Sequence, residues 1–110
     1  MDPLAQLAQE DSRLLEGMLD GLERRVAAFR EEVLRRRREG RPADACGGVS
    51  PWDAERLIDE WHQLAVWLLA LAPYLDPMVS MRIAGRLLKL REVIRRACEE
   101  YMGAEEVGQG

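Results

Sequence analysis

The feature that most constrains the fold is a helix-capping residue followed by proline, which occurs three times: Asp2-Pro3, Ser50-Pro51 and Asp76-Pro77. In such a pair the capping side-chain oxygen accepts a hydrogen bond from a free N–H of the first helical turn. Proline at the first helical position has no N–H, and that N–H would lack a partner there in any case. Each pair therefore predicts the start of a helix.

The expected helix ends are marked by Gly40 with Pro42, by Pro73 and by Gly103. They predict helices over residues 3–39, 51–72 and 77–102, within a single domain, 1–103, followed by a flexible acidic tail, 104–110. The short connection between the second and third helices predicts an antiparallel hairpin.

Composition supports an all-α fold. The chain has no Thr and no Asn, whereas the good helix formers Ala, Leu, Glu and Arg dominate. We therefore expect a three-helix up-down-up bundle, in which the long helix 3–39 packs along the hairpin and oligomerisation completes the core.

Each predicted helix carries an apolar stripe. In helix 3–39 the stripe repeats every seven residues, as in a coiled coil: Leu15, Leu19, Leu22, Val26, Phe29 and Val33. Helix 51–72 has Leu57, Ile58, Trp61, Leu64, Ala65, Leu68, Leu71 and Ala72, and helix 77–102 has Ile83, Leu87, Leu90, Ile94, Ala97 and Tyr101. Trp61 is predicted at the centre of the core, in contact with both other helices. Gly17 and Gly21 predict a kink, with close approach of another helix as the alternative.

Helix 51–72 is apolar beyond its stripe, because it also carries Val66, Trp67 and Ala70. A three-helix domain cannot bury a helix that is apolar all round. We expect a homo-oligomer, most simply a twofold dimer, with these three residues and the stripe of helix 3–39 at the contact.

Charge alternates along the chain in blocks, although the net charge is only −4. One interpretation is a nucleic-acid surface formed by Arg35, Arg36, Arg37, Arg38, Arg41, Arg82, Arg86, Lys89 and Arg96. The other is internal pairing, which we favour because an up-down-up course brings every basic block beside an acidic one. In particular, the acidic start of helix 51–72 is expected beside Arg95 and Arg96.

Residues with catalytic or metal-binding chemistry are scarce. His62 is the only histidine. It follows Glu55 and Asp59 at helical spacing, but a metal site needs three or four ligands, so we expect it to be hydrogen-bonded to Asp59. Cys46 is expected to be an exposed thiol, and Cys98 a small residue of the core or an interface. We expect no enzymatic activity, no metal and no cofactor.

The longest apolar run, Leu64 to Ala72, is too short to cross a bilayer, and the start of the chain lacks the pattern of a signal peptide. Two scattered cysteines favour a reducing cytoplasm, and the preference for Arg over Lys fits a thermophile. The sequence thus predicts a small helical protein-interaction module, regulatory or an accessory subunit, that acts through a self-associating apolar face. The alternative is a nucleic-acid-binding protein.

Overall fold

A computed structural model describes the backbone of residues 3–39 and 51–109, and the side chains of residues 3–39 and 53–100. The elements are α1 (Pro3–Glu39), α2 (Pro51–Leu71), the short 3-10 helix η1 (Ala72–Tyr74) and α3 (Pro77–Gln109). No strand occurs in these ranges, so the predicted all-α class is confirmed.

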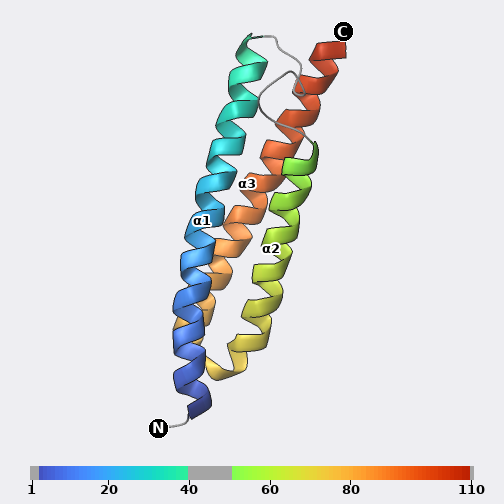
Figure 1. Cartoon of the computed structure of the whole chain (residues 1–110). Helices are drawn as coiled ribbons and strands as arrows, with labels where there is room; N and C mark the ends of the chain where they lie inside the picture. Colours follow the sequence, from blue (N-terminus) through green and yellow to red (C-terminus); the bar gives the residue numbers. More distant parts are fainter. Residues whose placement is uncertain (1–2, 40–50, 110) are drawn as a thin grey trace.

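The three helices lie side by side along the molecule, which measures 62 × 20 × 16 Å. Figure 1 shows the N-terminal end of α1 and the connection η1 at one end, and Glu39 and the C-terminal end of α3 at the other. Every helix packs on both of the others. Because the bundle is so narrow, each helix also keeps an outward face.

The helix starts at Pro3, Pro51 and Pro77 agree with the prediction. For α3 the cap itself is visible, since Asp76 Oδ1 accepts a hydrogen bond of 2.8 Å from the Met78 N–H. The capping residues Asp2 and Ser50 lie outside the described residues.

Two helix ends differ from the prediction. α2 ends at Leu71, one residue early, because Ala72 begins η1 with Pro73 in its first turn. The expected end of α3 at 102 is wrong, because the helix continues through Gly103 to Gln109. Glycine costs a helix only about 1 kcal/mol relative to alanine, and no proline follows to end it. Helical residues therefore replace most of the expected tail 104–110.

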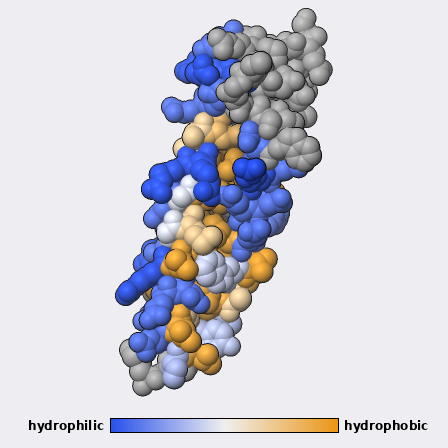
Figure 2. All heavy atoms as spheres, in the orientation of Figure 1, coloured by the Kyte–Doolittle hydropathy of each residue, from blue (hydrophilic) through white to orange (hydrophobic). Residues whose placement is uncertain are grey.

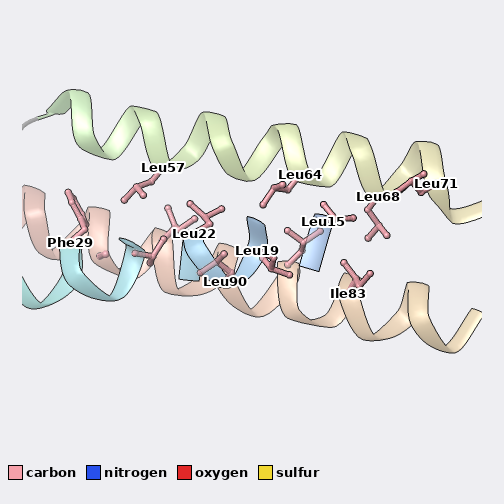
Figure 3. Packing of buried hydrophobic residues seen from close by; sticks show 14 of the residues in the cluster. Leu15, Leu19, Leu22, Phe29, Leu57, Leu64, Leu68, Leu71, Ile83 and Leu90 are labelled. Carbon is pink, nitrogen blue, oxygen red and sulfur yellow. The ribbon is translucent and has the colours of Figure 1, made fainter. Parts of the chain in front are cut away.

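The stripe predicted for helix 3–39 is buried inside the chain. Leu15, Leu19, Leu22 and Val33 are fully inaccessible, and the buried row extends to Ala8, Ser12 and Arg36 along the same seven-residue repeat. Figure 3 shows Leu15, Leu19, Leu22 and Phe29 of this stripe together with buried leucines of α2 and with Ile83 and Leu90 of α3. The expectation that this stripe faces a second copy is therefore revised, because the chain's own hairpin covers it.

The hairpin stripes are confirmed at their leucine positions and, in α3, at both isoleucines and Ala97. α2 buries Leu57, Leu64, Leu68 and Leu71, and α3 buries Ile83, Leu87, Leu90, Ile94 and Ala97. Ile58 is exposed, Ala65 and Ala72 are half-buried, and the side chain of Tyr101 lies outside the described residues.

Trp61 and Trp67 of α2 differ from their predicted places. Trp61 lies at the edge of the core, not at its centre, and donates a hydrogen bond of 2.8 Å from Nε1 to the Leu87 carbonyl of α3. Trp67 was expected on the outer surface, but it is half-buried and packs against the core. The position of Trp61 reflects its amphipathic character, since its indole packs against the core and keeps its N–H at an acceptor.

The glycines of α1 show neither expected feature. α1 continues through Gly17 and Gly21 without a sharp bend. A Cβ at Gly17 would meet nothing within 4 Å, and one at Gly21 would meet only the tips of Arg24 and Arg25, at 4.0 Å. Nothing in the described part of the chain therefore requires glycine at either position.

Candidate interaction surface

The charge blocks meet across the helix interfaces. Arg82 and Arg86 of α3 form ion pairs with α1, Arg82 with Glu16 at 2.5 Å and Arg86 with both Asp20 and Glu23. The hydrogen bonds that Arg86 donates to Glu23 and Asp20 raise the pKa of its guanidinium. The predicted pairing of the acidic first half of α1 with the basic first half of α3 is confirmed.

Other pairs connect the second half of α1 to its neighbours. Arg25 bonds to Glu60 of α2, which joins the basic part of α1 to the acidic start of α2 as predicted. Arg30 Nε lies 3.5 Å from Glu100 Oε2 of α3. These two atoms are buried, have no hydrogen-bond partner and stabilise each other only through their charges.

Several arginines pair within their own helix. Arg35 bonds to Glu32 and Glu39, and Arg36 Nε donates to Glu32 at 3.0 Å. Hydrogen bonds from Arg35 and Arg36 lower the pKa of Glu32 from 4.5 to about 2.

Arg95 and Arg96 were expected beside the acidic start of α2. Instead, Arg95 pairs with Glu92 and Glu99, and Arg96 pairs with Glu92, all within α3. Spacings of three and four residues bring side chains together on one helix without the entropy cost of reaching across an interface. This part of the pairing prediction is wrong.

The proposed nucleic-acid contacts are mostly engaged inside the chain. Those in ion pairs are Arg35, Arg36, Arg82, Arg86 and Arg96, and Arg36 is also buried. Arg37, Arg38 and Lys89 are exposed, and Arg41 lies outside the described residues. The structure therefore leaves only part of the predicted basic surface open to a phosphate backbone.

The described part of the chain brings no metal-binding group together. His62 is exposed, and its ring packs edge-on against Trp61, with the ring centres 5.3 Å apart. No group of three His, Cys, Asp or Glu side chains in the described ranges could hold a metal. Burial raises the pKa of the Cys98 thiol, which makes it less reactive, and Cys46 lies outside the described residues.

A groove of about 290 Å³ lies between α1 and α2. It is lined by Arg25, Ala28, Phe29, Glu32, Asp53, Arg56, Leu57 and Glu60. The Arg25–Glu60 ion pair joins its two walls. Acidic and basic side chains are mixed in its lining, and the described lining residues include no histidine, cysteine or serine.

The Arg25–Glu60 pair also fixes how α1 and α2 are aligned. The two helices run in opposite directions in Figure 1, and seven residues make about two turns of either. Met18, seven residues before Arg25, therefore lies level with Trp67, seven residues after Glu60. By the same spacing Leu14, eleven residues before Arg25, lies level with Leu71, which directly follows Ala70.

Beyond the ion pair this flank becomes apolar. Leu7, Leu14 and Met18 of α1 are each at least half exposed, as is Tyr74 of η1. Figure 2 shows hydrophobic residues gathered over the N-terminal half of α1 and the neighbouring part of α2, whereas the other half of the same face is hydrophilic. We call this surface the α1–α2 apolar face; it comprises Leu7, Leu14, Met18, Trp67, Ala70 and Tyr74, with Val66 at its edge.

The sequence analysis singled out Val66, Trp67 and Ala70 of α2 for an interaction face, but it did not single out the exposed α1 side chains Leu7, Leu14 and Met18. The missed signal is a second seven-residue repeat in α1, at Leu4, Leu7, Leu14 and Met18, one residue before the buried stripe. Other exposed apolar side chains, Leu69 on α2 and Met78, Met81 and Leu88 on α3, lie outside the α1–α2 apolar face.

No helix in the described ranges is long and apolar enough to cross a membrane. No protein-family model matches the chain, and comparisons with curated proteins and with solved structures find no match.

Proposed function

We propose that this protein is a small helical protein-interaction module, a regulatory or accessory subunit, which forms a twofold homodimer through the α1–α2 apolar face. The chain itself is taken to follow an up-down-up course, which the order of the ion pairs between α1 and α3 supports. Residues 16, 20 and 30 of α1 pair with 82, 86 and 100 of α3, so both helices advance in the same direction.

The observation that carries the proposal is the gathering of exposed apolar side chains on one face. Leu14 is 60% exposed and Met18 51% exposed, beside the half-buried ring of Trp67. Removing apolar surface from water stabilises an assembly by about 25 cal/mol per Å². A second copy presents the same face, and twofold dimers are the commonest closed assembly.

The nucleic-acid alternative has weaker support. Phosphate binding needs cations that are free to release counterions, and five of the proposed contacts are held in ion pairs. Within the described residues, by contrast, Leu7, Leu14 and Met18 of the apolar face are each at least half exposed.

Light scattering and sedimentation velocity test the proposal. The parent chain is expected at twice its monomer mass in the micromolar range, and Leu14→Glu at the monomer mass. Met81→Glu is the matched control, because Met81 is similarly exposed but lies outside the α1–α2 apolar face. A parent chain that stays monomeric throughout this range would overturn the proposal.

A further inference from the structure

We infer that the second copy binds antiparallel along α1, with the twofold axis passing beside Met18. This inference rests on the proposed homodimer and adds the partner, its orientation and its register. It is drawn from one row of residues on α1, which we call the α1 row: Leu7, Asp11, Leu14, Met18, Gly21, Arg25 and Ala28.

The α1 row lies on the side of α1 that faces α2. Its members follow alternating steps of three and four residues, the spacing by which one helix contacts another along its length. Arg25 and Ala28 line the groove with α2. The buried stripe of α1 runs beside this row, so the row remains at the surface.

When the α1 row of a second copy runs in the opposite direction, the side chains that face each other are complementary in size. Met18 meets Met18 of the second copy, Leu14 meets Gly21, and Leu7 meets Ala28. Away from the axis, where Met18 meets its own copy, each leucine of the row is thus opposite a small residue of the second copy. Packing of large against small side chains fills an interface without voids or overlap.

In the same antiparallel arrangement, charged side chains of the two copies that face each other have opposite signs. Asp11 is the only acidic residue between Leu7 and Met18 in the row, and it meets Arg25 of the second copy. Asp11 forms no ion pair within the described part of the chain. Arg25 uses Nη2 for Glu60, and its side chain remains 58% exposed. A guanidinium has five N–H donors, so Arg25 can bind a second carboxylate without leaving Glu60.

Gly21 gains a role in this arrangement. Within one chain a Cβ at Gly21 would have only ordinary contact with arginine side chains, so the chain gains nothing there from glycine. Opposite Leu14 of a second copy, the missing side chain lets the two helices approach. Gly17 does not belong to the row and is not opposite any of these residues.

Engineered disulfides test the orientation. In a Cys46→Ser, Cys98→Ala background, Met18→Cys is expected to oxidise to a covalent dimer. Leu14→Cys alone is not, because an antiparallel partner places the two copies of residue 14 about eight residues apart, roughly 12 Å, beyond the span of a disulfide. A mixture of Leu14→Cys and Gly21→Cys chains is expected to cross-link, whereas Arg24→Cys, off the row, is the negative control.

Charge reversal tests the register. Asp11→Arg and Arg25→Glu each place like charges together twice in the dimer, and each is expected to weaken dimerisation at least about tenfold. The double variant is expected to restore most of that loss. Circular dichroism of each variant checks that the monomer is still folded.

The possible results separate the two ideas. A dimer in which Leu14→Cys cross-links to itself, or in which the double charge variant restores nothing, overturns the antiparallel register and leaves the homodimer standing. A monomeric parent chain overturns both.

Discussion

At the scale of single residues, side chains that combine a polar and an apolar part differ most from their predicted places. A helical stripe predicts that Trp61 points toward the core, but it says nothing about where an indole N–H finds an acceptor. In the structure the Leu87 carbonyl is that acceptor, and the Arg91 guanidinium lies 5.7 Å from the centre of the ring. The position of Trp61 therefore depends on α3, which a pattern within α2 cannot predict.

Trp61→Phe is expected to lower the free energy of unfolding more than Trp67→Phe does. Both changes remove a similar amount of ring, but only Trp61 donates a hydrogen bond in the described structure. A hydrogen bond of this kind contributes about 0.5–1.5 kcal/mol, and that is the expected difference in urea unfolding. Equal losses for the two variants would show that the Trp61 hydrogen bond contributes nothing.

Glu32 is expected to contribute to the acid sensitivity of the fold. Its pKa is about 2 in the folded chain and 4.5 without its arginine partners. Its stabilising effect is therefore fully present above pH 4.5 and is lost as the pH falls toward 2.

In Glu32→Gln the urea midpoint is accordingly expected to fall less steeply between pH 4.5 and 2 than in the parent. Glu31→Gln is the matched control, because Glu31 is exposed and forms no ion pair in the described part of the chain. If both variants follow the parent curve, Glu32 does not contribute to acid unfolding.

At the scale of helices, the sequence predicted starts better than ends, and buried stripes better than surface ones. A capping residue followed by proline acts only on the adjacent helical turn. The helix starts at Pro3, Pro51 and Pro77 could therefore be predicted from adjacent residues alone. The apolar flank of α1 was missed because its residues are no more apolar than those of the buried stripe. Only the position of α2 shows which of the two rows is covered.

Gly17→Ala is expected to stabilise α1. Glycine costs an exposed helix about 0.5–1 kcal/mol relative to alanine, and a Cβ at Gly17 would meet nothing within 4 Å. The free energy of unfolding from urea titration is expected to rise by about that amount, with the parent's oligomeric mass unchanged. A loss of stability, or a change of mass, would mean that the outer side of α1 at Gly17 is covered by a partner.

At the scale of the whole molecule, alternating charge predicted which helices meet, and apolar excess predicted that one face needs a partner. The pairs Arg82–Glu16 and Arg25–Glu60 join charge blocks that the sequence analysis had matched by assuming an up-down-up course. Arg95 is the exception, because it forms its ion pairs with Glu92 and Glu99 on its own helix and not with α2. The alternating charge blocks of the sequence thus predict ion pairs between helices only where an arginine has no acidic residue three or four positions away on its own helix.

The melting temperature of the parent chain is expected to rise with chain concentration. Only the folded chain presents the α1–α2 apolar face, so dimerisation draws the equilibrium toward the folded state by mass action. Melts recorded by circular dichroism over a hundredfold range of concentration measure the effect. In Leu14→Glu the melting temperature is expected not to depend on concentration, whereas in Met81→Glu it should keep the parent's slope. Sedimentation could still show a dimer while the melting temperature of the parent does not depend on concentration. That result would mean that the dimer dissociates before the chain unfolds. The face would then contribute to assembly without stabilising the fold.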